Sequence, residues 1–317
     1  MRDGFVLIAG NSAPTNAICG HIDMSGETGI RYGLFPAQGS VRGTVCFLQG
    51  RGECIERNFE TIRDLTARGF QVATLDWRGQ GGSPEATGKL RHGHVSDFSL
   101  YLDDFNRFMQ EIVLPDCPPP YLLMGNSMGG HLGLHVISKH NWFEAAVMVS
   151  PFIDITKSRL PRWCKVAVVV TMSWLGMGRL KVPLHPSRLP EAGDFETNPL
   201  TSDKMRYLRN VRLWHEAPGL SATAPTAGWV HAALRSCRRL QALNIDTPLR
   251  CPALLVIAAK DTVVSNEAIQ QFARHVPGAV TVSINGARHD ILCERDTFRD
   301  QFLAAFDAFV ADHVRKG

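Results

Sequence analysis

The stretch YLLMGNSMGGHLGLHVISKH (121–140) joins an apolar run to a helical pattern through a tight turn, and the G-x-S-x-G motif at 125–129 lies on that turn. A serine on a strand-to-helix turn adopts strained backbone angles, and the flanking positions must be almost free of side chain for strand and helix to approach. Gly125 and Gly129 meet that need. Ser127 then begins a helix, where backbone amides and the helix dipole stabilise negative charge on a nearby oxygen.

Apolar runs on either side of this stretch predict further strands. They are TVCFLQG (44–50), QVATLDW (71–77), AAVMVS (145–150), ALLVIAAKD (253–261) and AVTVSI (279–284). Because these runs are hydrophobic almost throughout, we expect buried strands of a parallel sheet that is covered on both faces. Helical patterns lie between them, most clearly at 98–112 and again at 298–309. The alternation predicts an α/β fold with a mostly parallel, doubly wound sheet.

The alternation stops between residues 152 and 240, where short helical pieces punctuated by prolines replace the strands. We therefore expect a helical cap at 152–240, inserted between a first part of the core at 29–151 and a second part at 241–317. Residues 1–28 lack clear periodicity and are interpreted as an N-terminal extension, ahead of a hairpin-like segment that begins at Gly29.

Composition excludes several classes of function. A formal charge of +4 over 317 residues, with no DNA- or RNA-reading motif, argues against nucleic acid as a partner. The eight cysteines form no C-x-x-C pair and no regular framework, which argues against a zinc site and a disulfide scaffold. The N-terminal apolar patch is too short for a secretory signal, and the longest apolar stretch, 166–177, is too short to span a bilayer. We expect a cytoplasmic protein, and the sequence leaves its oligomeric state open.

Two residues downstream of the serine complete a catalytic set. A serine hydroxyl needs a base within hydrogen-bond reach, and that base needs a carboxylate to fix its tautomer. Asp261 ends the apolar run 253–261, and catalytic groups collect at the carboxyl ends of parallel strands. His289 follows the run 279–284 in a polar loop. We predict Ser127 as nucleophile, His289 as general base and Asp261 as orienting acid, in the chain order Ser, Asp, His.

Other titratable residues compete for the acid and base roles. Asp154 is an alternative acid that we rank below Asp261. Asp290 cannot easily turn back to orient its own neighbour, His289. His131 is interpreted as packing or pocket lining rather than as the base.

Acyl transfer also needs hydrogen-bond donors aimed at the developing oxyanion. The first is expected to be the backbone N–H of Met128, the residue after the nucleophile. The second is expected from the loop LQGRGE (48–53), where Gly50 allows the chain to turn and the backbone N–H of Arg51 points into the site.

Together the motifs resemble the monoglyceride lipase and lysophospholipase branch of the α/β-hydrolase superfamily, which includes serine aminopeptidase-type hydrolases. They are LQGRGE (48–53), TLDWRGQGGS (74–83), GNSMGG (125–130), AAKDTVVS (258–265) and GARHDILCERD (286–296). The resemblance implies hydrolysis of a carboxylic ester of a glycerolipid through an acyl-serine, without metal or cofactor. Gln49 and Asn126 depart from the pattern, because many relatives carry His at these places. The backbone donors are unchanged, so the departures bear on substrate preference.

A lysophospholipase or monoacylglycerol lipase is the interpretation that we favour, with a small-molecule ester or lysolipid as substrate. An aminopeptidase, an acyltransferase and a non-lipid carboxylesterase share the same motifs. A noncatalytic ligand-binding protein of this fold is a further alternative, although no residue of the predicted triad is missing.

The cap is expected to select the substrate. Its apolar segment VAVVVTMSWLGMG (166–178) offers side chains for an acyl chain, and basic residues flank this segment: Arg159, Arg162, Lys165, Arg179 and Lys181. An apolar segment with a basic rim is typical of transient contact with a membrane surface. A buried cap helix with solvated ends is the alternative, to which we give equal weight.

Overall fold

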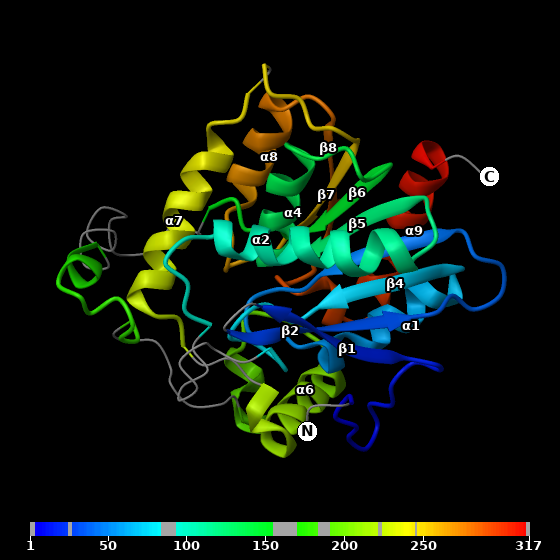
Figure 1. Ribbon diagram of the computed structural model, residues 1–317, viewed down its shortest axis with the longest axis horizontal. Coiled ribbons are helices and arrows are strands. Elements are labelled where there is room, and N and C mark those ends of the chain that lie inside the picture. The colour runs from blue at the N-terminus through cyan, green and yellow to red at the C-terminus, as the bar shows by residue number, and fades with distance from the viewer. Residues whose placement is uncertain are drawn as a thin grey trace.

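The computed structural model describes residues 4–24, 27–83, 93–154, 170–182, 191–220, 224–244 and 246–314. Within these residues an 8-stranded sheet runs through the molecule in the order β1-β2-β4-β3-β5-β6-β7-β8 (Figure 1). The strands are β1 (Ile18–Met24), β2 (Glu27–Phe35), β3 (Gly43–Leu48), β4 (Phe70–Leu75), β5 (Tyr121–Asn126), β6 (Ala145–Val149), β7 (Ala253–Ala258) and β8 (Ala279–Ile284). The neighbours from β4 to β8 pair in parallel, whereas β1 and β2 join antiparallel.

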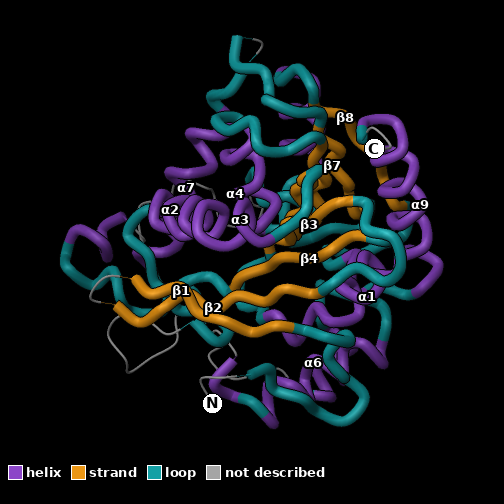
Figure 2. The backbone as a smooth tube through the Cα atoms, turned by 45° about the vertical axis from the view of Figure 1, so that its right-hand side comes forward, coloured by secondary structure: helices purple, strands orange, loops and turns teal. Residues whose placement is uncertain are grey.

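Helices cover both faces of the sheet (Figure 2). On one face, α2 (Ser99–Phe108), α4 (Met128–Ile137) and α8 (Asn266–His275) pack against a large apolar core. On the other face, α1 (Phe59–Ala67) and α9 (Asp296–His313) bury a second core. Every residue of β3, β6 and β7 is buried, as a strand covered on both sides requires. The predicted α/β class with a mostly parallel, doubly wound sheet is confirmed.

The helical pattern at 98–112 forms α2 and then a π-helical turn, η2 (Met109–Val113), before the short α3 (Leu114–Asp116). Its apolar stripe is buried at Phe98 and Phe105. The stripe therefore packs on the sheet as its spacing indicates.

Both edges of the sheet differ from what the sequence pattern indicates. The run 279–284 is predicted to be buried, but β8 is an edge strand and its Val280 is 52% exposed. At the opposite edge β1 pairs with β2, so the boundary expected at residue 28 falls inside a hairpin. Residues 18–24 are therefore part of the sheet rather than of an extension. Edge strands are covered less completely than central ones, so their hydrophobic pattern is a weaker signal.

Among the described residues, helical segments and loops connect β6 to β7, without a further strand of the sheet. The helical segments are a turn at 170–174, η3 (Ala192–Thr197), α6 (Lys204–Glu216), η4 (Pro218–Leu220) and α7 (Ala227–Gln241). Side-chain caps begin the two long helices: Asp203 accepts from the backbone of Arg206 at 2.8 Å, and Thr226 accepts from that of Trp229 at 3.1 Å. α7 then packs on the core that contains α4 and α2 through Trp229 and neighbouring small residues.

Candidate active site

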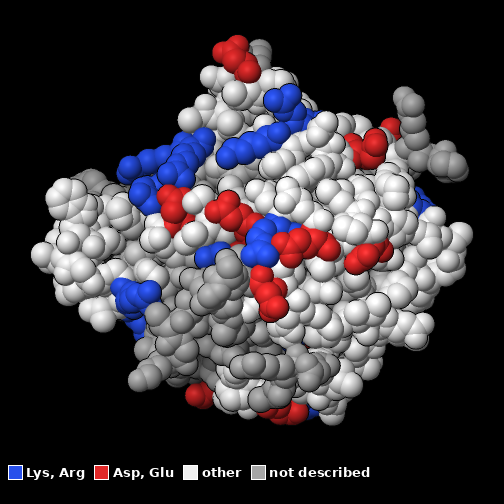
Figure 3. All heavy atoms as spheres, viewed as in Figure 1, with Lys and Arg blue, Asp and Glu red and all other residues white. Residues whose placement is uncertain are grey.

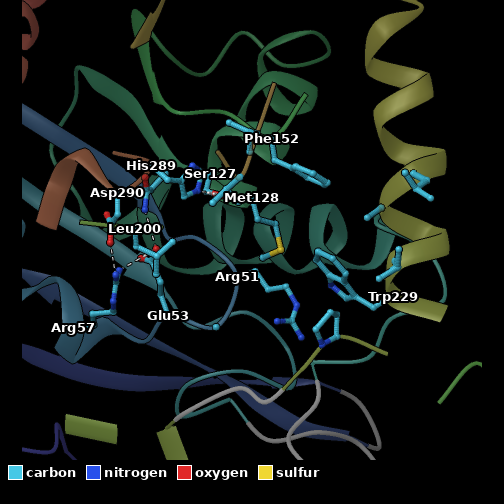
Figure 4. Close-up of a pocket in the computed structure, with 18 of the residues that line it drawn as sticks. Arg51, Glu53, Arg57, Ser127, Met128, Phe152, Leu200, Trp229, His289 and Asp290 are labelled. Carbon is cyan, nitrogen blue, oxygen red and sulfur yellow. Dashed lines mark hydrogen bonds and ion pairs between the residues drawn. The ribbon is translucent and has the colours of Figure 1, made fainter. Parts of the chain in front are cut away.

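A pocket of about 460 Å³ lies where the central strands end at their carboxyl termini (Figure 4). Ser127 directly follows β5, Arg51 lies in the loop after β3, and His289 lies in the loop after β8. Loops from several parallel strands meet at this edge, so residues distant in sequence share one pocket.

The turn that carries Ser127 is strained. Ser127 has φ 50° and ψ −109°, angles that a residue with a side chain rarely adopts. A Cβ at Gly129 would lie 2.0 Å from the carbonyl oxygen of Leu48, and a Cβ at Gly125 would lie 2.6 Å from that of Gly129. The absence of side chains there lets the helix approach the sheet. The turn is held by the Ser127 backbone N–H, which donates to Val149 at 2.9 Å.

Ser127, His289 and Asp261 form a hydrogen-bonded chain. His289 Nε2 lies 3.0 Å from Ser127 Oγ, and His289 Nδ1 lies 2.7 Å from Asp261 Oδ2. The other carboxylate oxygen of Asp261 accepts backbone N–H bonds from Val263 at 2.7 Å and Val264 at 3.0 Å. Those two bonds fix the carboxylate, so Oδ2 is held toward the imidazole. The structure thus brings together the three residues that the sequence indicated.

Buried polar contacts hold the loop of His289. Ser150 Oγ donates to the backbone carbonyl of His289 at 2.8 Å. Asp290 forms a buried ion pair with Arg57, which also lies 3.1 Å from Glu53. Burial raises the pKa of Asp290, but the charge and the hydrogen bond of Arg57, together with smaller effects of His289 and Cys293, hold that pKa below its ordinary value. Asp290 therefore anchors the loop, in keeping with the argument that it cannot orient its neighbour.

Met128 and Arg51, the expected oxyanion residues, both line the pocket beside Ser127. The two departures from the family pattern have structural partners. Gln49 Nε2 donates to Asp76 Oδ1 at 2.7 Å, and Asn126 Nδ2 donates to Glu53 Oε1 at 2.8 Å. These two hydrogen bonds help to hold the loop after β3 in place.

The alternative acid and base lie elsewhere. Asp154 lines a second cavity of about 590 Å³, bordered by the end of α7 and by α8. His131 is fully buried, with Nδ1 2.7 Å from the carbonyl oxygen of Phe152 and Nε2 2.7 Å from Ser236 Oγ. Burial lowers the pKa of His131 well below its ordinary value, so its imidazole is neutral. Its contacts agree with a packing role.

The pocket wall contains residues that the sequence did not single out. α7 contributes Trp229, Val230, Ala233 and Leu234, and Phe152, Leu200, Trp214 and Pro225 contribute further apolar surface. The expected acyl-binding segment 166–178 is described only from residue 170, and there Trp174 is 86% exposed. Trp229, Val230, Ala233 and Leu234 recur at helical spacing, a signal that indicates an apolar helix face but not that this face lines the pocket.

Comparison with known families and proteins identifies relatives of this chain. Residues 39–296 match the family described as serine aminopeptidase, S33. The chain is 29% identical over 304 residues to lysophospholipase L2 of Escherichia coli (strain K12), covering 90% of this chain and 84% of that one. It is 25% identical over 291 residues to the probable lysophospholipase L2 of Haemophilus influenzae, covering 90% of each chain.

Solved structures show the same fold. The chain matches a soluble variant of monoglyceride lipase from Saccharomyces cerevisiae with a TM-score of 0.75 and 19% identity, over 94% of this chain and 97% of that one. It matches the monoacylglycerol lipase of Paleococcus ferrophilus with a TM-score of 0.67 and 20% identity, over 90% and 99%. The family match spans most of the chain and includes the pocket-lining residues from Arg51 to Asp290. The protein therefore belongs to the serine aminopeptidase S33 family and is a hydrolase with the α/β-hydrolase fold.

Proposed function

We propose that this hydrolase is a lysophospholipase that cleaves the carboxylic ester of a lysophospholipid through an acyl-enzyme on Ser127. The observation that carries the proposal is the hydrogen-bonded chain from Ser127 through His289 to Asp261 at the wall of an apolar pocket. The names of the relatives from Escherichia coli and Haemophilus influenzae support this substrate class.

In the first half of the proposed reaction, His289 Nε2 accepts the proton of Ser127 Oγ as that oxygen attacks the ester carbonyl. Asp261 holds Nδ1 protonated and stabilises the imidazolium. The oxyanion of the tetrahedral intermediate accepts hydrogen bonds from the backbone N–H groups of Met128 and Arg51. His289 then gives its proton to the leaving alkoxide, and the glycerophosphodiester departs.

In the second half, a water molecule takes the place of the departed alcohol. His289 accepts a proton from this water as its oxygen attacks the acyl carbonyl, and the same oxyanion donors stabilise the second tetrahedral intermediate. Collapse of the intermediate returns the proton to Ser127 and releases a fatty acid. Each group ends in the state in which it began.

The shape and chemistry of the pocket suit an acyl chain. Its volume of about 460 Å³ and its wall of Trp229, Leu234 and Phe152 offer apolar surface to an acyl chain. We propose that residues 152–240 act as a cap, because α7 supplies much of this wall while β6 and β7 on either side belong to the sheet. The core then comprises the chain before and after the cap, with the β1–β2 hairpin included.

We further propose transient contact with a lipid surface through the segment at residues 170–182. Figure 1 shows its helical turn projecting from the edge of the molecule, away from the sheet. Trp174 is 86% exposed, Leu175 67% and Leu180 54%, and the basic Arg179 and Lys181 adjoin them. Exposed apolar side chains beside basic ones match an interfacial anchor. Arg159, Arg162 and Lys165 of the expected basic rim lie outside the described residues.

Among the described residues, no helix combines the length and the apolar character needed to cross a bilayer. We propose a peripheral protein in the cytoplasm on two other observations. No disulfide joins the cysteines in the described part of the chain, as is usual in a reducing compartment. Figure 3 shows basic side chains gathered over α7, where Arg235 and Arg239 pair with Asp97, and this basic surface suits an anionic membrane nearby.

A substrate panel tests the proposed function. Purified protein is assayed with 1-lysophosphatidylcholine, a monoacylglycerol of the same acyl chain, p-nitrophenyl esters of increasing chain length, and aminoacyl amides. We expect hydrolysis of the lysophospholipid and a rate on p-nitrophenyl esters that increases with acyl length. Preference for aminoacyl amides or for short esters would contradict the lysophospholipase assignment.

A further inference from the structure

Residues 5–13, which precede β1, contain a tight turn between Ile8 and Asn11. The two residues pair in an isolated bridge, and the backbone N–H of Asn11 donates to the carbonyl oxygen of Ile8 at 3.1 Å. Gly10, with φ 77°, provides the left-handed backbone conformation within this turn. The side chain of Leu7 is 62% exposed, whereas that of Ile8 is only 7% exposed. The local sequence therefore directs Ile8, and not its neighbour, into the protein.

Hydrogen bonds fix this segment to the turn η1 (Ile55–Asn58), which follows β3. Glu56 of η1 is fully buried, and its Oε1 accepts the backbone N–H of Val6 at 3.0 Å. The backbone carbonyl oxygen of Glu56 accepts from Asn11 Nδ2 at 2.8 Å. The same turn carries Arg57, which anchors the loop of the general base. Residues 5–13 are thus bonded to the part of the core that supports the catalytic loops.

The buried side chain in this segment also contacts the helix α6. Figure 1 shows the blue start of the described chain beside α6. A single buried apolar cluster joins the segment, the chain just before η1, and the end of α6 with the turn that follows it: Ile8, Cys54, Leu213, Ala217 and Leu220. Residues that are far apart in the sequence therefore pack around Ile8.

Different parts of the protein hold the two ends of α6. Near its start, Arg206 pairs with Glu60 at 2.5 Å and with Asp296 at 2.6 Å. Its last turn carries Trp214, which lines the pocket. Leu213, the residue before Trp214, belongs to the buried cluster around Ile8. Because packing in a protein interior is close, a change at Ile8 should shift or loosen this end of the helix.

We propose that residues 5–13 form a strap that positions α6 against the catalytic loops, with Ile8 as the positioning residue for the pocket wall at Trp214. The strap is bonded to η1 and packs on α6, so it sets the place of this wall relative to the loops. A substrate that fills the pocket should depend on the strap, whereas a substrate that is too small to fill it should not. The inference rests on the proposed esterase function for its kinetic measurement.

Michaelis constants for two p-nitrophenyl esters, the dodecanoate and the acetate, test the strap. Ile8→Ser removes an apolar side chain from the buried cluster. We expect KM for the dodecanoate to rise by about 4-fold or more, the effect of one methylene group losing its apolar contact, and KM for the acetate to change by less than about 2-fold. Ile8→Val keeps most of the contact and should restore the wild-type KM. Leu7→Ser, at the exposed neighbouring position, is the matched control and should leave both constants unchanged.

A fall of kcat on both esters with unchanged KM would show that Ile8 only stabilises the fold, and would overturn the strap. Failure of the wild-type protein to hydrolyse the dodecanoate would instead overturn the proposed function. Ile8→Ala, a milder change, serves for the same measurements where Ile8→Ser does not fold.

Backbone amide exchange, followed by mass spectrometry without substrate, tests the strap independently of activity. We expect Ile8→Ser to exchange faster than the wild-type protein and Leu7→Ser in peptides from α6, while peptides from α8 keep their wild-type rate. Unchanged exchange in α6, or an equal increase in α8, would contradict the positioning of α6 by the strap.

Discussion

The buried ion pair between Arg57 and Asp290 ties the turn η1 (Ile55–Asn58), which follows β3, to the loop that carries His289. Each of the two side chains is 4% exposed. Because Asp290 adjoins His289 in the chain, the pair fixes the backbone from which the imidazole extends. The position of the general base, His289, thus depends on Arg57, a residue in a different loop of the pocket.

Breaking this pair should cost both stability and turnover. Arg57→Met leaves Asp290 as an uncompensated buried charge, so we expect the free energy of unfolding to fall by about 3–5 kcal/mol. We also expect kcat to fall, because the loop of His289 loses its anchor. Urea unfolding and steady-state kinetics measure the two effects. The double variant Arg57→Met with Asp290→Leu should be less destabilised than Arg57→Met alone, and a single variant as stable as wild type would contradict the role of the pair.

Asp261→Asn tests the orientation of the imidazole. An amide presents a donor where Nδ1–H of His289 now meets a carboxylate oxygen at 2.7 Å, so the productive tautomer is disfavoured. We expect kcat to fall by about 10⁴-fold, as for the equivalent change in the serine protease triad. Thermal unfolding serves as the control for an intact fold. A variant that retains full kcat would show that another group, such as Asp154, supplies the acid.

Two buried histidines predict a pH dependence of stability. Burial lowers the pKa of His131 well below its ordinary value and that of His135 to about 4. In the unfolded chain both titrate near pH 6.5, so below that pH the unfolded state binds protons that the folded state does not. The stabilisation is complete above about pH 6.5 and decreases as the pH falls, by up to about 1.4 kcal/mol per pH unit for each histidine. Urea unfolding at pH 7, 6 and 5 measures this slope.

The variant His135→Gln isolates one of the two contributions. Its side chain can still reach Ser236 Oγ, which lies 3.1 Å from His135 Nε2, but it cannot bind a proton in this range. We expect about half of the wild-type slope between pH 6.5 and 5. An unchanged slope would mean that other groups produce the pH dependence.

The exposed apolar side chains of the cap segment should contribute to lipid binding. Replacing Trp174 and Leu175 with serine removes apolar surface that would enter the lipid interface, so we expect vesicle affinity to fall by about 10-fold or more. Co-sedimentation with vesicles that contain anionic phospholipid measures this. Val280→Ser, at an exposed apolar position on β8, is the matched control. Equal binding by the double variant and the control would contradict contact through this segment.

Much of the fold could be predicted because its signals are local. The central strands are buried on both faces, so their sequences are continuously apolar, and the strained turn at Ser127 requires glycines at fixed positions. The edges could not be predicted equally well. β8 is partly exposed, and polar residues interrupt the apolar ones in both edge strands, Thr281 and Ser283 in β8 and His21 and Asp23 in β1, so neither strand is a continuous apolar run.

The candidate site divides in the same way. Ser127, Asp261 and His289 each stand just after a predicted strand, and parallel strands deliver such residues to one edge of the sheet. The wall of the pocket and its supporting ion pair depend on contacts between distant segments. Trp229 approaches Arg51 only because α7 packs across the open end of the sheet, and Arg57 meets Asp290 across 233 residues of chain. No local pattern encodes either contact.

Covalent labelling tests the nucleophile most directly. The wild-type protein and Ser127→Ala are treated with a fluorophosphonate probe, and the modified peptide is identified by mass spectrometry. Ser127 should carry the label in the wild-type protein, and Ser127→Ala should remain folded, unlabelled and inactive toward 1-lysophosphatidylcholine. Labelling at a different residue, or hydrolysis of the lysophospholipid by folded Ser127→Ala, would contradict the assignment of Ser127 as the nucleophile.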